Sequence, residues 1–538
     1  MLNRLKSIFI QISSILVVFL LSVSIFLQRR FIVFSDAAKF ADVARTWLNI
    51  GLYGQSFTFW TTNLKYPFSV GGILPVMPFS IVVLFKIFGV NDFAVIATSF
   101  FYFLLTLVFV FLLAKKVFKK NLIVVLSTLA IGFNYDLINY ATSGASETPF
   151  IFEIVTASYF VSIRKKWGTV AAFSILILMY FTRPQAFIYI AGIILFWLLI
   201  NFKTKRAIIY FAVISGVGLL IDKFVLTPLS GKYFLYSIIG RGMYSTFAQG
   251  VSTNSSNTLR GMVVSQNFVS LLTIFKNTFY NLYNFFKLIP QIMSPYLWAL
   301  FVISLFRWGK NKVANALKVS TIFMVVITFL VTALTIPFYR YLHPVVPLVY
   351  LFAVETLVWM VGKGVDEWEV FKINKQKAVV IISGILVFLF VVGQTLGVIF
   401  LDSRYKSKLV NKGKPPVYAQ LSYILRNNTN PSDIVVTNLD SWGSWYGERK
   451  TVWYPLKPDM LIPPEGQKNP FDAIFLTSYL MDDENYYMGE EWRQIFENPK
   501  SPKDEFIAKN YKFAGEFKVP AEETYEKQEG RAILLVRN

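Results

Sequence analysis

Two carboxylates and two arginines stand near the ends of apolar stretches in this sequence: Asp36, Glu147, Arg183 and Arg340. An ionisable side chain within or beside a membrane-crossing segment is costly and marks function by default. An arginine can hold a phosphate through two parallel hydrogen bonds, and a carboxylate can take up a proton. Together the four residues suit chemistry on a phosphate-linked substrate.

Each of the four also has an ordinary structural explanation. Asp36 opens a helical pattern in which its side-chain oxygen could cap free amide groups, and Glu147 could cap a helix expected to begin at Pro149. Arg183 and Arg340 could extend their side chains to the membrane interface. Taken singly, the structural explanations are favoured; the functional one gains weight only when the four are considered together.

The residue types also limit metal chemistry. His343 is the only histidine, so a histidine-rich metal site is excluded, although His343 stays a candidate contact to the acceptor or sugar. The chain has no cysteine, which excludes disulfides and thiolate sites. Asp136 is interpreted as a structural residue near the turn that carries Glu147. No cofactor is required by these residues, and a divalent cation held by Asp36 and Glu147 is left open.

The elements that must position these residues are membrane helices. The 538 residues are 55% hydrophobic with a mean hydropathy of +0.52, and several apolar runs are long enough to cross a bilayer. The first run is interpreted as a retained helix, because no small-residue cleavage site follows it. The net charge of +22 lies largely in short basic clusters between apolar segments, as the positive-inside rule requires, and does not indicate nucleic-acid binding.

Placing these basic clusters in the cytoplasm predicts eleven spans, with the N-terminus inside and the C-terminus outside. The location expected is the plasma (cytoplasmic) membrane. The predicted spans cover residues 8–28, 93–114, 121–140, 147–163, 168–182, 185–201, 207–227, 284–306, 317–336, 343–361 and 378–400. The fold class is therefore mainly α, a polytopic membrane protein with a small α/β domain at its C-terminal end.

The first outer loop, residues 29–92, is predicted to hold two juxtamembrane helices. The first begins near Asp36 and places apolar side chains such as Phe40 and Trp47 on one face, so it should lie along the membrane surface. The second, residues 70–88, is apolar enough to cross. A crossing would place the basic cluster at 115–120 outside, so we interpret it as a helix that enters the membrane without spanning it.

Two further outer regions are expected. The loop at 228–283 contains Lys and Arg but no Asp or Glu, which suits an anion or lipid head group as well as a solvated basic loop. After Pro415 the composition becomes polar, with a helix predicted at 417–427. Strands are predicted at 434–437, 451–453, 473–477 and 532–536. The predicted domains are a membrane domain at 1–400 and an extracytoplasmic α/β domain at 401–538.

Over roughly residues 8–360 the chain resembles the GT-C superfamily of membrane glycosyltransferases, and within it the bacterial relatives of protein O-mannosyltransferases and lipid A aminoarabinose transferases. The resemblance rests on the order of short motifs. These are Asp36 with a helix ending in Gly51-Leu52-Tyr53, Leu84–Gly89, Ser143–Glu147, Thr182–Pro184 and Arg340–Pro347. Such families move a sugar from a polyprenyl-phosphate carrier to an acceptor on the outer face.

The resemblance implies roles for single residues. Asp36 would be the catalytic base, Glu147 a second acidic residue of the site, and Arg183 and Arg340 ligands of the donor phosphate. The expected reaction is a single displacement that inverts the sugar carbon, catalysed by a hexosyl- or pentosyltransferase. Many relatives have Asp-Glu where this chain has Asp36-Ala37, so any role of that Glu is missing or supplied elsewhere.

Four side chains are candidate contacts to the acceptor or sugar: Tyr53, His343, Trp442 and Trp445. The two tryptophans belong to Ser441–Gly447, which loosely resembles the Trp-Trp-Asp motif of oligosaccharyltransferases, but the Asp is absent and the spacing differs. They are therefore interpreted as core or sugar-stacking residues. The acceptor is left open among protein, lipid and glycan.

Three other functions remain open from the residues. A flippase or transporter of lipid-linked sugars would also use intramembrane charges, although these gather at one face and the sequence has no inverted repeat. A polymerase or ligase of surface polysaccharide would use the same class of donor. An inactive transferase fold could serve as a scaffold.

Overall fold

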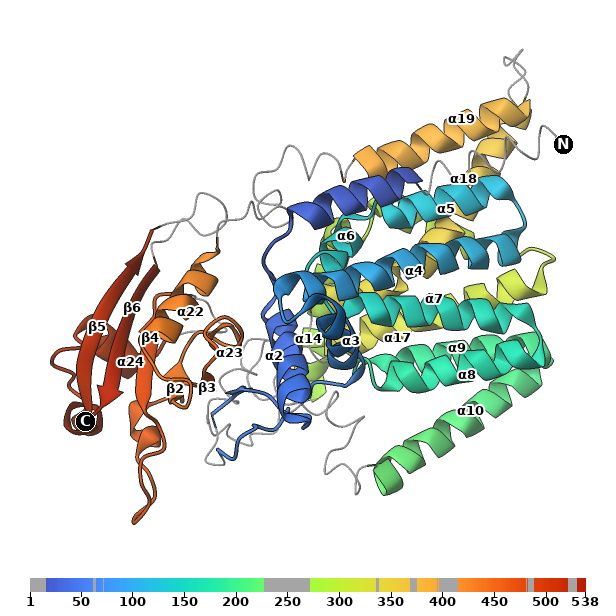
Figure 1. Ribbon diagram of the computed structural model, residues 1–538. Helices are drawn as coiled ribbons and strands as arrows, with labels where there is room; N and C mark the ends of the chain where they lie inside the picture. The colour runs from blue at the N-terminus through green and yellow to red at the C-terminus, as the bar shows by residue number, and fades with distance from the viewer. Residues whose placement is uncertain are drawn as a thin grey trace. The chain divides into compact units, whose positions relative to one another are not determined.

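The computed structural model of the protein describes residues 16–60, 64–70, 72–226, 271–334, 338–367, 375–393, 395, 415–479, 481, 488–520 and 530–538. They form two compact units (Figure 1). One contains the described residues of 16–27, 99–226 and 271–395; the other contains those of 28–98 and 415–538. The predicted boundary at residue 400 does not follow this division, because the first outer loop packs with the C-terminal segment.

The first unit is a bundle of helices. Two of its helices are shared with the second unit: Leu16–Gln28 belongs to the first unit up to Leu27, and α4 (Asp92–Phe118) belongs to it from Ser99 onward. The other helices of the first unit are α5 (Asn121–Gly132), α6 (Tyr135–Ala141), α7 (Glu147–Ile163), α8 (Lys166–Tyr180), α9 (Ala186–Asn201), α10 (Thr204–Ile221), α14 (Leu271–Lys287), α15 (Ile289–Ile292), α16 (Pro295–Ser304), α17 (Lys312–Leu334), η2 (Tyr339–Val345), α18 (Val346–Glu367) and α19 (Lys375–Val387). Neighbouring helices α7, α8 and α9 pack against one another, as Figure 1 also shows.

Apolar length supports a polytopic membrane protein. Five of the described helices are long and apolar enough to cross a bilayer, or six if α5 and α6, bent by 63° at their junction, count as one span. Shorter apolar helices, α8, α9 and α16 among them, lie at other predicted spans. The chain is thus an integral membrane protein, while the predicted number of eleven spans is not confirmed.

The segment predicted as one span at 284–306 is interrupted. It comprises the end of α14, the short helix α15 and then α16, which begins at Pro295. Proline lacks a backbone N–H and disfavours a helical conformation in the residue before it, so Pro295 marks a natural break. The loop predicted at 228–283 is helical from Leu271 within α14, and its earlier part lies outside the described residues.

Both predicted outer helices are present in the second unit. The helix α2 (Ser35–Ile50) ends at Gly51, whose φ of 76° is the left-handed conformation that glycine adopts readily. The helix α3 (Val76–Phe88) packs against α2. The buried face of α2 differs from the prediction, because it is formed mainly by small residues such as Ala37, Ala41 and Ala44. Small side chains allow other elements to approach α2 closely.

The second unit is built on a mixed sheet of six strands in the order β1-β3-β2-β4-β6-β5. The strands are β1 (Phe57–Thr58), β2 (Ile434–Thr437), β3 (Lys450–Trp453), β4 (Ala473–Thr477), β5 (Tyr511–Val519) and β6 (Gly530–Arg537). β1 to β4 are mutually parallel, whereas β6 and β5 are antiparallel to their neighbours. Four strands and the helix α22 (Val417–Asn427) confirm sequence predictions; β5 and β1 were not predicted.

The strand β1 explains how the first outer loop joins this sheet. Phe57 and Thr58 pair with Thr451 and Val452 of β3, and Ser56 accepts a hydrogen bond from the Thr451 amide at 2.8 Å. Phe57 is 1% exposed and packs in the same apolar core as residues of the C-terminal segment. Parts of the chain that are almost 400 residues apart therefore form one folded unit.

Candidate functional site

Glu147 and Arg183 form a buried ion pair in the first unit. Glu147 is the first residue of α7, and Arg183 lies in the turn between α8 and α9, two helices that pack on α7. The Arg183 Nη1 and the Glu147 Oε1 are 2.7 Å apart, and Nη1 also donates to the Ser146 hydroxyl at 2.9 Å. Glu147 is 3% exposed and Arg183 is 7% exposed, so neither side chain is a solvated charge at the membrane interface. The helix begins at Glu147 itself rather than at Pro149, and Ser146 holds the cap position, so Glu147 is not its N-cap.

Several buried polar atoms in this ion pair and next to it lack a hydrogen-bond partner. Within the described part of the chain, the buried Arg183 Nε and Gln185 Nε2 have no hydrogen-bond partner. The Glu147 Oε1, although close to Nη1, is not aligned for a hydrogen bond. A buried polar atom without a partner costs about 1–3 kcal/mol, so such atoms call for an explanation. A bound ligand with oxygen atoms would satisfy both nitrogen donors.

The second predicted arginine lies beside the first. Arg340 belongs to η2, which packs against α7. The ring of Tyr341 has both guanidinium groups near it, with Cζ of Arg183 at 5.9 Å and Cζ of Arg340 at 5.6 Å from the ring centre. Two guanidinium groups and one carboxylate, that of Glu147, are thus placed close to one aromatic ring.

His343, which lies close to this group, has hydrogen-bond partners on both ring nitrogens. Its ring is fully buried; Nδ1 is 2.7 Å from the Tyr140 hydroxyl, and Nε2 is 3.2 Å from the Gln291 carbonyl oxygen. The carboxylate of Asp136 is 3.5 Å from the same Nε2. His343 is therefore a packed residue with partners on both ring nitrogens, and Asp136 orients it. This agrees with the structural interpretation of Asp136.

One neighbour of this group, Glu153, was missed by the sequence analysis. Glu153, six residues after Glu147 on α7, is 3% exposed and accepts a hydrogen bond from the Thr182 hydroxyl at 2.7 Å. The turn that carries Thr182 and Arg183 is therefore bound to α7 through two carboxylates, those of Glu153 and Glu147. The available signal was the Glu in an otherwise apolar predicted span, together with the Thr-Arg-Pro motif.

Asp36 is found in the second unit, as the second residue of α2. Its predicted role as an N-cap is wrong, because Phe34 holds the cap position and no side chain caps the helix. A carboxylate in the first helical turn is favoured by the helix dipole. The side chain is partly exposed, as a base that meets a substrate must be. The predicted grouping of Asp36 with the residues of the first unit stays a prediction.

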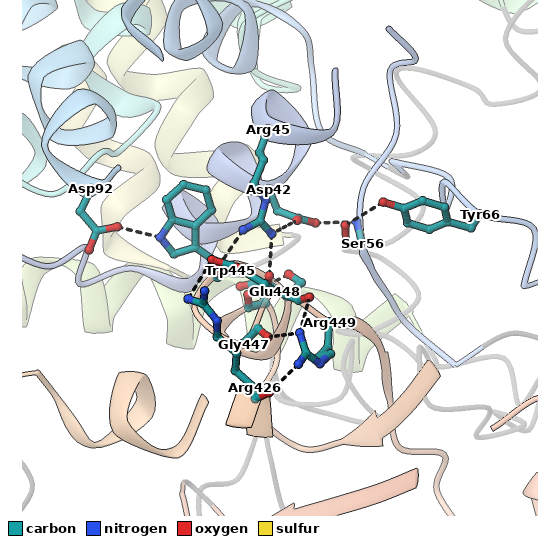
Figure 2. A network of polar contacts seen from close by, with 12 residues as sticks. Asp42, Arg45, Ser56, Tyr66, Asp92, Arg426, Trp445, Gly447, Glu448 and Arg449 are labelled. Atoms are coloured by element: carbon teal, nitrogen blue, oxygen red, sulfur yellow. Dashed lines mark hydrogen bonds and ion pairs between the residues drawn. The ribbon is translucent and has the colours of Figure 1, made fainter. Parts of the chain in front are cut away.

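Charges on α2 beyond Asp36 were also missed. Lys39, three residues later, is 3.3 Å from the carboxylate of Asp440. Asp42 is fully buried; it accepts from the Ser56 amide at 2.6 Å and from Arg45 at 2.8 Å (Figure 2). Their i, i+3 spacing was the available signal. These pairs hold α2 in place rather than expose charge to a ligand.

The remaining candidate contacts differ in exposure. Tyr53 is 38% exposed and donates to the Ile73 carbonyl, so its ring is accessible. Trp442 and Trp445 are only 3% and 6% exposed, and Trp445 stacks on Phe85 of α3 at a centroid distance of 6.0 Å. Of the two interpretations given for these tryptophans, their packing favours the core.

Within the described residues, no group of three or more His, Asp or Glu side chains lies close enough together to hold a metal ion. Asp36 and Glu147, the two residues for which the sequence left a divalent cation open, belong to different units.

Comparison with known proteins shows the fold. No protein-family model and no curated protein matches the sequence. The structure is similar to that of ArnT from Cupriavidus metallidurans bound to undecaprenyl phosphate, with a TM-score of 0.51 and 12% identity over 98% of this chain and 97% of that one. The apo state of the same protein gives a TM-score of 0.50 at 13% identity, covering 99% and 98%. The chain thus has an ArnT-like fold over nearly its whole length.

Proposed function

We propose that the protein is a membrane glycosyltransferase that moves a sugar from a polyprenyl-phosphate carrier to an acceptor hydroxyl outside the cytoplasm. The observation that carries the proposal is the ArnT-like fold, because it covers both the helical unit and the unit with the sheet. ArnT is a lipid A aminoarabinose transferase, and its structure is bound to undecaprenyl phosphate.

The donor phosphate is proposed to bind at Arg183 and Arg340. Arg183 has a buried Nε without a partner among the described residues, and both guanidinium groups adjoin Tyr341. Planar guanidinium groups suit the oxygens of a phosphate, and they stabilise the charge that grows on the leaving oxygen. Glu147 is proposed to orient Arg183 through their 2.7 Å ion pair rather than to take part in proton transfer.

Asp36 is proposed as the base. It removes the proton of the acceptor hydroxyl while that oxygen forms a bond to the anomeric carbon. The bond between this carbon and the phosphate oxygen breaks, its electron pair stays on the phosphate, and polyprenyl phosphate leaves. A single displacement of this kind inverts the configuration of the sugar carbon. The partial exposure of Asp36 in the first turn of α2 supports this role.

The experiment is transfer from a panel of radiolabelled polyprenyl-phosphate hexoses and pentoses into membranes that carry wild type or Asp36→Asn. We expect label to move with the wild type, and Asp36→Asn to reduce the rate at least about a hundredfold with donor binding retained. A parallel reaction with a chelator reports whether a divalent cation is needed. Unchanged transfer by Asp36→Asn would remove this residue from the mechanism.

The same panel separates the enzyme from the alternatives. Movement of intact lipid-linked sugar across vesicles without transfer would identify a transporter. Transfer only of preassembled glycan chains would identify a polymerase or ligase. The labelled product shows whether the acceptor is protein, lipid or glycan.

A further inference from the structure

The chain entering α2 is held by aromatic residues of the C-terminal segment. The amide of Ile32 donates to the Tyr446 hydroxyl at 3.2 Å, and the Ile32 carbonyl accepts from the Tyr418 hydroxyl at 2.5 Å. Both backbone groups of Ile32, four residues before Asp36, are thus engaged by two side chains of the same unit. The path of the backbone toward Asp36 depends on these tyrosines.

Residues 441–446, which include the short helix α23 (Trp442–Trp445), continue this hold along α2; we term them the tryptophan turn. The Ser441 hydroxyl donates to the Ser35 carbonyl at 2.8 Å, next to Asp36 in the chain. Farther along α2, the guanidinium of Arg45 donates to the Trp445 and Ser444 carbonyls at 3.0 and 2.6 Å. The turn therefore contacts α2 on both sides of Asp36 in the sequence.

The tryptophan turn is itself fixed by a carboxylate at the start of α4 (Figure 2). Asp92 accepts from the Trp445 indole at 2.7 Å, as Figure 2 shows. It also accepts from the Tyr446 hydroxyl at 2.6 Å. Burial and the neighbouring charge of Asp92 raise the pKa of Tyr446 well above its ordinary value, so this phenol stays protonated and donates to Asp92. One hydroxyl thus connects the entry of α2 to the beginning of α4.

Hydrogen bonds within the unit hold the carboxyl end of β2, just before this turn in the chain. The strand β2 lies between β3 and β4, and in open α/β sheets ligands bind at the carboxyl ends of strands where the strand order reverses. Here Asn438 bridges that position, with its amide donating to the Thr477 carbonyl at 2.8 Å and its oxygen accepting from the Thr477 amide at 2.8 Å. This end of the sheet, where a ligand could bind, instead carries the tryptophan turn, and the turn binds α2.

The aromatic side chains are also packed too closely to receive a sugar. Tyr418, Trp442, Trp445 and Tyr446 are between 3% and 9% exposed. The rings of Tyr418 and Trp442 stack with centroids 4.1 Å apart. A sugar that stacks on an aromatic ring needs an open face, which these rings lack.

We propose that the tryptophan turn is a positioning element of the reaction: it sets the place of Asp36 by binding α2 before and after this residue in the sequence, and it does not recognise the acceptor. The inference rests on the proposed function, in which Asp36 is the base. Tyr446 and Ser441 are the positioning residues, since each acts on the backbone before Asp36. A small displacement of a catalytic group lowers kcat steeply, whereas substrate binding elsewhere is unaffected.

The test is Tyr446→Phe in the full-length protein, with Tyr511→Phe as the matched control. Tyr511 is also a buried tyrosine with two hydrogen bonds in the same unit, from the Asn469 amide at 2.8 Å and to the Phe471 carbonyl at 3.3 Å, but these hold the far part of the sheet. We expect Tyr446→Phe to lower kcat about tenfold with the KM values for donor and acceptor unchanged. Tyr511→Phe should leave kcat within about twofold of wild type.

Two further measurements report on positioning itself. Hydrogen exchange should become about tenfold faster at amides 32–38 in Tyr446→Phe and not in Tyr511→Phe, because the Ile32 amide loses its acceptor. Ser441→Ala should lower kcat in the same way, and Ser441→Thr, which keeps the hydroxyl, should restore it.

The outcomes separate the inference from the proposed function. An acceptor KM that rises in Tyr446→Phe at constant kcat would assign the turn to acceptor recognition and overturn the inference. Equal losses of kcat in Tyr446→Phe and Tyr511→Phe would show that the turn contributes only to the stability of the unit, and this would also overturn the inference. Wild type inactive with every donor would overturn the proposed function, whereas an active Tyr446→Phe with unchanged exchange and kcat would overturn the inference alone.

Discussion

Arg183 is the residue on which most of the candidate site converges. Its guanidinium meets the Glu147 carboxylate, the Ser146 hydroxyl and the ring of Tyr341, and its Nε still lacks a partner among the described residues. An arginine paired to a carboxylate keeps its geometry while other nitrogens stay available to a phosphate. Glu147, which the sequence analysis identified only as a second acidic residue, is therefore proposed to orient Arg183.

The pairing predicts different effects on stability and activity. Arg183→Met should destabilise the folded state by about 3–5 kcal/mol, because Glu147 is left as a buried charge without its partner. The double variant Arg183→Met, Glu147→Gln should recover most of that loss but not the transfer activity. Thermal unfolding in detergent and the transfer assay measure the two quantities. Arg183→Lys should remain inactive although charged, since an ammonium cannot present a planar pair of donors.

Recovery of transfer in the double variant would show that Arg183 serves only to neutralise Glu147. Full activity of Arg183→Lys would show that charge alone suffices at this position.

At the scale of elements, short segments do the positioning. The strand β1 has only two residues, yet it places Phe57 in the core of the unit that also contains β3 and Trp453. α3 and the tryptophan turn cover α2 through its alanine-rich face. The start of α7 and the turn between α8 and α9 bring Glu147 to Arg183. In each case the contacts are made between elements distant in the sequence.

The contribution of β1 can be tested with Phe57→Ala. A fully buried Phe that becomes Ala typically costs about 3–5 kcal/mol, so the unit with the sheet should unfold at lower denaturant and amides of β3 should exchange faster. The control is Phe79→Ala in α3, where the side chain is 55% exposed and the expected cost is below about 1 kcal/mol. Equal effects of the two substitutions would contradict a structural role for β1 in the sheet.

At the scale of the whole molecule, the membrane orientation follows from charge alone and awaits a direct measurement. The predicted arrangement places residues 29–92 and the C-terminal segment outside and the basic clusters inside. The absence of cysteine makes this measurable without background, because any introduced cysteine is the only thiol in the chain.

Single cysteines at exposed positions should therefore react selectively with a membrane-impermeant maleimide in intact cells. We expect labelling of Lys512→Cys in β5 and Val90→Cys between α3 and α4, and none of Lys116→Cys until the cells are permeabilised. Labelling of Val90→Cys tests in particular whether α3 stays on the outer side. The reverse pattern would invert the orientation, and protection of Val90→Cys alone would make α3 a span.

Hydrophobic length, charge bias and local propensity were enough to predict the membrane class, both outer helices, α22 and most strands. These properties depend on neighbouring residues in the chain, so they are visible in the sequence. Asp36, Glu147, Arg183 and Arg340 could be singled out for the same reason, since a charge beside an apolar run is a local signal. The resemblance of their motifs added an expected fold, with which the ArnT-like structure agrees, and Asp36 as base stays a prediction.

Only the tertiary structure decided which of these residues meet and what holds them. The pairing of Glu147 with Arg183, the placement of Arg340 beside the same tyrosine, and the union of β1 with β3 depend on distant segments packing together. The tryptophan turn shows this most clearly: its aromatic composition suited a sugar-binding surface, whereas burial and hydrogen bonds to Asp92 and Arg45 make it a support for α2. The type of a side chain limits which partners it can bind, whereas its packing in the folded chain determines which of those partners it contacts.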